Sequence, residues 1–137
     1  IEATPPPPPV PDMSRATVAL VTDGGLVPSG NPDRIPRAFA QVWGAYAIEG
    51  MDSLRPGEYE VAHGGYDNRA VEEDPHRLVP VDVLREMERD GLVGKLHPEF
   101  LSTTGNSNPL ENSRRMGREM AARLNEAGVD SVILTST

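Results

Sequence analysis

One stretch decides the fold class: Thr17-Val18-Ala19-Leu20-Val21-Thr22, followed by Asp23-Gly24-Gly25. Its six residues are apolar or β-branched without polar alternation, which is typical of a strand buried on both faces, and the paired glycines mark a turn. Strands of that kind occur in parallel sheets that helices cover on both sides. The stretch therefore predicts the first strand of an α/β domain.

The rest of the chain alternates strand and helix signals. Further strands are expected at 59–63, 100–104 and 132–135, and helices from Pro80 to Gly91 and from Pro109 to about Ala127. Alternating elements favour βαβ units. We predict a Rossmann/flavodoxin-like three-layer domain with a mainly parallel sheet of about four strands. The inner face of the second helix is expected to consist of Leu110, Gly117, Met120, Ala121 and Leu124.

The segment 26–57 fits this alternation poorly because it contains four prolines. We interpret it as a long excursion with one short helix near 37–42. Long ordered loops in compact domains are often functional. Trp43, Tyr46 and Ile48 indicate that the segment is ordered.

Composition excludes several classes of function. The 137 residues carry 13 Lys and Arg against 21 Asp and Glu, a net charge of −8. Nucleic-acid backbones and anionic membranes attract basic surfaces, so we expect neither as a partner. No run of about 18 apolar residues is present. The absence of cysteine excludes disulfides and thiol catalysis within these residues.

Both ends differ from the middle. Six prolines among the first eleven residues favour polyproline II, so we expect a linker at 1–12 and an α/β domain at 13–137. A ligand for a proline-recognising domain is the alternative. The domain ends on a strand that the sequence predicts to be buried, and we expect it to be incomplete at the C-terminus.

Small and polar residues follow each predicted strand. They are Asp23-Gly24-Gly25, His63-Gly64-Gly65-Tyr66-Asp67, Thr104-Gly105-Asn106-Ser107-Asn108 and Thr135-Ser136-Thr137. Ligands bind outside the carboxyl ends of strands in open α/β sheets. Each turn taken singly is well explained by ordinary turn chemistry, but the four together lead us to expect a ligand-binding rim there.

Two side chains of the rim can do chemistry. His63 is a candidate general acid or base, or a hydrogen-bond donor to a substrate carboxylate. Alternatively, it is a half-buried histidine hydrogen-bonded to the backbone. Asp23 can bind a cation or an amine, or alternatively shape an Asx turn. Asn106 to Asn108 precede a helix whose N–H groups can bind an anion or simply be capped. His76 and His97 are expected to be solvated, and no histidine spacing indicates a metal site.

Several phrases of the chain resemble one known family. Val21-Thr22-Asp23-Gly24-Gly25-Leu26-Val27-Pro28, Gly30-Asn31-Pro32, Ile48-Glu49-Gly50 and His63-Gly64-Gly65-Tyr66-Asp67 are similar to the gamma subunit, or selenoprotein B, of component B of glycine/sarcosine/betaine reductase. The similarity continues through Glu73-Asp74-Pro75-His76-Arg77, Pro80-Val81-Asp82-Val83 and Val132-Ile133-Leu134-Thr135-Ser136-Thr137.

The resemblance implies reductive cleavage of a C–N bond. A selenocysteine or cysteine is expected just after Thr137, a pyruvoyl group on a partner subunit, other subunits of a reductase complex as partners, and a cytoplasmic location. From their position at the rim, and not from a known family site, we expect Asp23 and His63 to be catalytic, binding or protonating the departing amine, and Thr104 and Asn106 to position the substrate carboxylate. The expected substrate-binding residues are Gly24, Gly25, Tyr66, Asp67, Thr104, Asn106, Thr135 and Thr137.

The expected function is thus part of a reductase acting on glycine, sarcosine, betaine or a related amine. Because the 137 residues contain no redox residue, we do not expect this chain to be active alone. The alternatives are a non-catalytic module that binds a small carboxylate or amine, and a subunit-assembly module.

Overall fold

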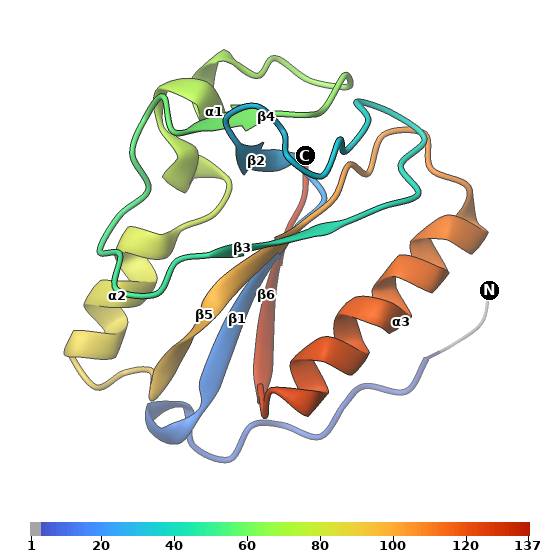
Figure 1. Ribbon diagram of the computed structural model, residues 1–137. Coiled ribbons are helices and arrows are strands. Elements are labelled where there is room, and N and C mark those ends of the chain that lie inside the picture. Colours follow the sequence, from blue (N-terminus) through green and yellow to red (C-terminus); the bar gives the residue numbers. More distant parts are fainter. Residues whose placement is uncertain (1–3) are drawn as a thin grey trace.

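The computed structural model describes residues 4–137 and shows a mixed α/β domain (Figure 1). Its strands are β1 (Thr17–Thr22), β2 (Leu26–Pro28), β3 (Gly44–Ala47), β4 (Tyr59–Val61), β5 (Lys95–Ser102) and β6 (Ser131–Thr135). Its α-helices are α1 (Arg69–Glu73), α2 (Val81–Arg89) and α3 (Leu110–Glu126), and two short 3-10 helices are η1 (Met13–Arg15) and η2 (Pro75–Arg77).

The main sheet has four strands in the order β3-β5-β1-β6. β1 is parallel to both of its neighbours, and β3 is antiparallel to β5. Thr22 pairs with Ser102 on one side and with Thr135 on the other, so three carboxyl ends are level. The predicted four-stranded, mostly parallel sheet is confirmed.

Helices cover both faces of this sheet (Figure 1). Val18, Leu20 and Phe100 belong to the larger core cluster, together with Val81 and Leu84 of α2. The alternate residues of β1 and β5 pack on the other side against α3, in a smaller cluster of Ala19, Val21, Leu101, Met120 and Leu124. Both faces of β1 are therefore buried, as its sequence predicts.

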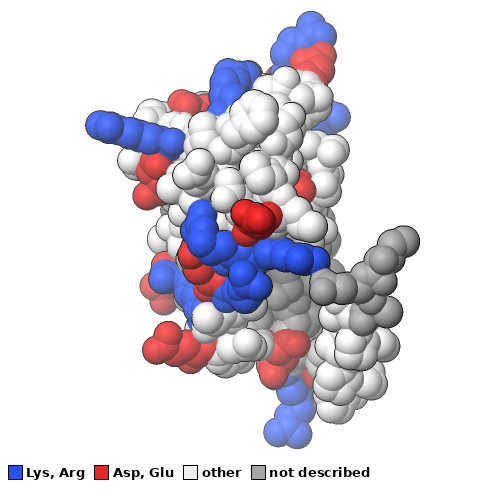
Figure 2. All heavy atoms as spheres, turned by 90° about the vertical axis from the view of Figure 1, so that its right-hand side faces the viewer, with Lys and Arg blue, Asp and Glu red and all other residues white. Residues whose placement is uncertain are grey.

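The inner face of α3 differs from the prediction. Its buried residues are Met116, Met120 and Leu124, which recur every four positions, whereas Leu110, Gly117 and Ala121 are exposed. Arginine and acidic side chains lie close together on the outward side, where Arg115 pairs with Glu119 at 2.9 Å and Arg123 with Glu99 at 2.7 Å (Figure 2). This side of the molecule therefore mixes both signs of charge.

β4 is a strand, but it does not join the main sheet. It pairs antiparallel with β2, a strand that sequence reasoning missed, in a separate two-stranded sheet. This small sheet lies beyond the carboxyl ends of β1 and β5 (Figure 1). The prediction of β4 as a member of the parallel sheet was wrong, because apolar runs identify strands without identifying their partners.

No helix forms at 37–42. Phe39 has φ 54°, which lies in the left-handed region and does not suit the interior of a right-handed helix. The excursion instead returns to the main sheet as β3, where Tyr46 packs on Phe100 with ring centroids 5.4 Å apart. The aromatic residues of the excursion are ordered, as expected.

β6 forms an edge of the main sheet and is not buried. Val132, Ile133 and Leu134 are 47%, 38% and 67% exposed. An edge strand has only one neighbouring strand. Successive side chains of β6 point to opposite faces of the sheet, and its apolar side chains are exposed on both faces. The expectation of a buried last strand was wrong, since burial depends on what covers a strand.

The proline-rich segment has no helix or strand over residues 4–12, and residues 1–3 of the predicted linker lie outside the described residues. Pro7, Pro8 and Val10 line a hollow together with residues of α3 and β6, including Leu124 and Val132. Within residues 4–137, no helix combines the length and the apolar character needed to cross a membrane.

Candidate functional site

A hollow of about 360 Å³ lies at the carboxyl ends of β1, β5 and β6. The residues that line it come from four separate parts of the chain: Asp23, His63, Gly65, Gly105, Asn106, Ser136 and Thr137. All of them lie in the polar turns that the sequence predicts to form a rim. We call this cavity the rim hollow.

Asp23 follows β1 directly, and its backbone N–H donates to the Thr135 carbonyl at 3.2 Å. Its carboxylate Oδ2 accepts a hydrogen bond from the Ser136 hydroxyl at 3.1 Å. A Cβ on Gly105 would lie 2.7 Å from that oxygen, so a larger residue would displace the carboxylate. Within the part of the chain that the structure describes, no Lys, Arg or His forms an ion pair with Asp23.

Hydrogen bonds of its neighbour Ala62, and not membership of the main sheet, place His63 at the rim hollow. The Ala62 N–H donates to the Gly25 carbonyl at 2.7 Å, and the Thr104 hydroxyl donates to the Ala62 carbonyl. These bonds join the small sheet to the ends of β1 and β5. His63 therefore lies near Asp23, although β4 belongs to another sheet.

The ring of His63 has a defined tautomer. Its Nδ1 accepts the backbone N–H of Gly65 at 3.0 Å, so the proton of the neutral ring is on Nε2. Burial lowers the pKa of His63; nearby Asp23 opposes this effect and Arg37 adds to it. The ring is thus neutral at pH 7. Among residues 4–137 its Nε2–H has no hydrogen-bond partner, which leaves a donor available.

Tyr66 supports His63 from one side. Its ring centroid lies 5.0 Å from that of His63, and its hydroxyl donates to the Gly24 carbonyl at 3.0 Å. Burial, Glu72 and Asp23 raise the pKa of Tyr66 to about 12. The phenol therefore stays protonated near neutral pH and fixes the ring beside His63.

The excursion closes another side of the site. The Asn106 amide and the Gly64 N–H both donate to the Arg37 carbonyl, at 3.2 and 2.9 Å. The Arg37 guanidinium donates to the His63 carbonyl at 3.3 Å. Sequence reasoning missed Arg37, because no local motif indicates where a proline-rich excursion runs.

Comparison with known proteins decides the family. The family model described as glycine/sarcosine/betaine reductase selenoprotein B matches residues 1–137. The chain belongs to this family. The resemblance found in the sequence is therefore confirmed.

Its similar relatives in this family are named as subunits of reductase complexes. The chain is 49% identical, over 99% of its length and 31% of the relative, to the glycine reductase complex component B subunit gamma of Carboxydothermus hydrogenoformans. It is 45% identical to the betaine reductase complex component B subunit beta of Peptoclostridium acidaminophilum, over 94% of the chain and 30% of the relative. It is 46% identical to the sarcosine reductase complex component B subunit beta of the same organism, over 99% of the chain and 31% of the relative.

The chain spans about a third of the length of these reductase subunits. No solved structure matches it. The site of this family member must therefore be described from its own residues.

Four of the residues that the sequence selects lie together in the rim hollow: Asp23, His63, Asn106 and Thr137. Gly65, Gly105 and Ser136 also line it, and they belong to the predicted turns without having been selected. The predicted convergence of these four turns at one hollow is thus observed.

The other selected residues lie around the hollow rather than in its lining. Gly24 and Gly25 allow close packing, because a Cβ would lie 2.6 Å from Leu78 in one case and 2.4 Å from the Ala62 carbonyl in the other. Tyr66 supports His63, and Thr104 is bonded to Ala62.

Asp67 and Thr135 also lie outside the lining. The Asp67 carboxylate pairs with Arg69 at 2.5 Å, and hydrogen bonds from Arg69 lower the pKa of Asp67. The Thr135 hydroxyl is buried and has no hydrogen-bond partner among the residues that the structure describes, while the Thr135 carbonyl accepts from the Thr22 hydroxyl at 3.3 Å. Within residues 4–137 no group of three or more His, Asp or Glu side chains could hold a metal ion.

The expectation that His76 and His97 are solvated was wrong. The side chain of His76 is 17% exposed, and its Nε2 accepts the Leu54 N–H at 2.8 Å. His97 is 6% exposed within β5, and burial lowers its pKa. Neither histidine lines the rim hollow.

Proposed function

We propose that this chain forms part of a reductase that cleaves the C–N bond of glycine, sarcosine, betaine or a related amine, and that the rim hollow binds this substrate. The single observation that carries the proposal is that one hollow contains both a carboxylate, Asp23, that forms no ion pair within residues 4–137 and a neutral histidine, His63. The three named substrates share a carboxylate close to an amine or ammonium nitrogen. A hollow with one anionic group and one N–H donor complements both ends of such a molecule.

Asp23 binds the nitrogen end in this proposal. Within residues 4–137 its carboxylate has the Ser136 hydroxyl as a partner and forms no ion pair, so a bound ammonium group would supply the missing positive charge. His63 donates its Nε2–H to the substrate carboxylate. To act as a general acid, the His63 ring would need a second proton on Nδ1. That proton would face the Gly65 N–H, and burial also disfavours the charged ring, so His63 is better suited to donate a hydrogen bond than to act as a general acid.

The nucleophile that the resemblance implies would follow Thr137. Ser136 and Thr137 line the rim hollow, so a residue directly after Thr137 would lie beside the bound substrate. A selenocysteine or cysteine there would supply the nucleophile that attacks the α-carbon and displaces the amine. Asp23 and His63 orient the substrate for that attack.

The remaining parts of the proposal concern assembly and fold. We infer a Rossmann/flavodoxin-like domain at 13–137 after a linker at 1–12, and a place in a cytoplasmic complex whose partner subunit carries a pyruvoyl group. Neither a nucleic acid nor a membrane is a proposed partner, because the net charge is −8.

The test uses the subunit in the length that its gene encodes, assembled with the other subunits of its reductase complex. Release of ammonia, methylamine or trimethylamine from glycine, sarcosine or betaine is measured for Asp23→Asn and for the control Asp90→Asn. Asp90 is exposed at the end of α2, ahead of the start of β5. We expect Asp23→Asn to lose at least tenfold in turnover and the control to lose nothing. Equal turnover in both variants would exclude Asp23 from the site.

A further inference from the structure

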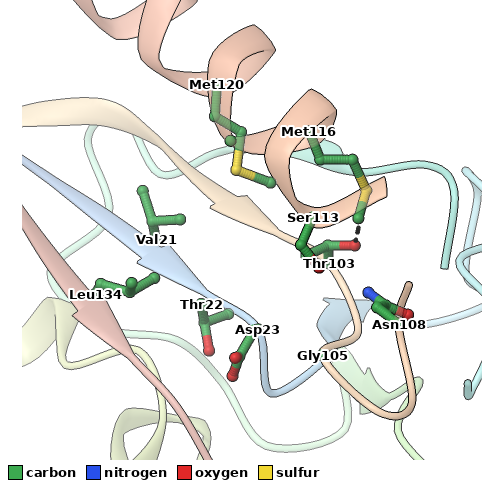
Figure 3. Close-up of a pocket in the computed structure, with 11 residues that line it drawn as sticks. Val21, Thr22, Asp23, Thr103, Gly105, Asn108, Ser113, Met116, Met120 and Leu134 are labelled. Carbon is green, nitrogen blue, oxygen red and sulfur yellow. Dashed lines mark hydrogen bonds between the residues drawn. The ribbon is translucent and has the colours of Figure 1, made fainter. Parts of the chain in front are cut away.

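A second cavity, of about 240 Å³, lies on the α3 side of the main sheet (Figure 3). It shares the lining residues Asp23 and Gly105 with the rim hollow, so the two cavities adjoin at these residues. We call it the α3 pocket.

Most of the α3 pocket is apolar. Figure 3 shows Met116 and Met120 extending from α3, and Val21 and Leu134 on strands β1 and β6. Thr22, Asn108 and Ser113 add polar groups to its wall. The Met116 sulfur also contacts the Thr103 hydroxyl at 3.5 Å.

Charge and wall chemistry together define the ligand class. Asp23 is the one charged residue in the lining, and within residues 4–137 no ion pair neutralises it. Hard metal cations require a shell of oxygen ligands that thioether and aliphatic side chains cannot provide. A cationic nitrogen with short alkyl groups fits better, because its charge faces the carboxylate and its methyl groups face carbon and sulfur.

We propose that the α3 pocket receives the N-alkyl groups of an ammonium ligand whose nitrogen lies at Asp23. The inference rests on the proposed function and refines it: the substrate is an N-methylated amino acid such as betaine or sarcosine, in preference to glycine. The carboxylate of this ligand lies in the rim hollow, and its methyl groups lie beneath α3.

The first test measures the pocket without any turnover. The methionine methyl groups of this chain are labelled with carbon-13, and the chain is titrated with tetramethylammonium chloride or with ammonium chloride. We expect tetramethylammonium to shift the Met116 and Met120 signals in a saturable way, with Met13, Met51 and Met87 as internal controls outside the lining. Ammonium should cause at least tenfold smaller shifts. Equal responses to both cations, or none, would overturn the proposal.

The second test fills the pocket. Gly117 lines it, and a Cβ there meets nothing within 4 Å, so Gly117→Leu can add side-chain volume to this wall of the pocket. Ser113→Leu fills it from another position, and Ala122→Leu, at an exposed α3 residue outside the lining, is the matched control. We expect both filling variants to weaken tetramethylammonium binding at least tenfold and the control to leave it unchanged.

Turnover then separates this inference from the proposed function. In the assembled complex, Gly117→Leu should reduce amine release from betaine at least tenfold. Any release of ammonia from glycine should be unaffected. Binding of tetramethylammonium without release of any amine would contradict the proposed function and leave the pocket assignment standing. Amine release that Gly117→Leu and Ala122→Leu reduce equally would overturn the pocket assignment. Contacts in the assembled complex between the Met120 methyl group and another protein side chain that fills the cavity would also overturn it.

Discussion

His63 and His76 are both largely buried, and the fold uses their rings differently. His76 accepts the Leu54 N–H on Nε2 at 2.8 Å, and its Nδ1 lies 3.2 Å from Asp74 and 3.7 Å from Asp82. His63 uses Nδ1 to accept the Gly65 N–H, and its Nε2–H has no partner among residues 4–137. The protein occupies both ring nitrogens of His76, whereas one donor of His63 stays unbonded within residues 4–137.

This difference distinguishes the structural role of His76 from the binding role that we propose for His63 more sharply than exposure does. The bonds of His76 connect η2 to the segment before β4, and neither His76 nor Leu54 lines the rim hollow. The bonds of His63 fix its tautomer at the wall of the rim hollow. Four predictions test the contrast.

Loss of the His63 ring should have the largest effect on function. A hydrogen bond to a charged group contributes about 1.5–3 kcal/mol, so His63→Ala should lower kcat/KM by roughly 10- to 100-fold. The assay is amine release by the assembled complex, and the control is His97→Gln, which lies in β5 outside the lining. A full retention of kcat/KM in His63→Ala would remove this ring from the site.

His76→Ala should show the opposite pattern. The Leu54 N–H, in a residue only 2% exposed, would lose its acceptor, and an unsatisfied buried donor costs about 1–3 kcal/mol. We expect the free energy of unfolding in urea to fall by about that amount, while ligand binding to the remaining folded protein is unchanged. A variant as stable as the parent chain would show that this bond contributes nothing.

Gly65→Ala should weaken binding more mildly. A Cβ at this position would lie 2.9 Å from Cε1 of His63, so the imidazole ring must shift. Such crowding costs on the order of 1 kcal/mol, which predicts a roughly fivefold loss of affinity in calorimetric titrations with betaine. An unchanged affinity would mean that the position of the ring is not critical.

The smallest effect concerns pH. Burial lowers the pKa of His63 and of His97, so the unfolded chain, with histidine pKa values of about 6.5, binds protons more readily than the folded one. Stability should therefore fall as the pH drops below about 6.5, and continue to fall until the lowered pKa values are passed. Urea unfolding between pH 8 and pH 5.5 measures this trend, and His97→Gln should flatten it. A midpoint that rises on acidification would contradict the prediction.

The sequence predicted well the elements whose signals are local. Strand β1 has a continuous apolar run, and helix α3 has apolar residues that recur every four positions. Both elements form close to the expected bounds. β3 was missed because its four residues follow a proline-rich segment and pair with β5 from the opposite direction. The exposure of β6 was missed because three apolar residues look alike in sequence whether or not anything covers them.

The rim was predicted for a reason that is only partly correct. Asp23, Asn106 and Thr137 follow strands of the main sheet and meet at its edge, as the parallel-sheet argument requires. His63 follows a strand of the small sheet and arrives there through the bonds of Ala62 to Gly25 and Thr104. Arg37 and the α3 pocket depend on contacts between distant segments, which no local pattern encodes.

The most direct test of the central claim is a titration of this chain with betaine, followed through the Cε1–H signals of its three histidines in NMR spectra. If the rim hollow binds the substrate through His63, the signal of His63 should shift in a saturable way, while those of His76 and His97 stay in place. Repeating the titration with Asp23→Asn should abolish the shift. A response shared equally by the three histidines, or an unchanged response in Asp23→Asn, would contradict the assignment of the rim hollow as the substrate site.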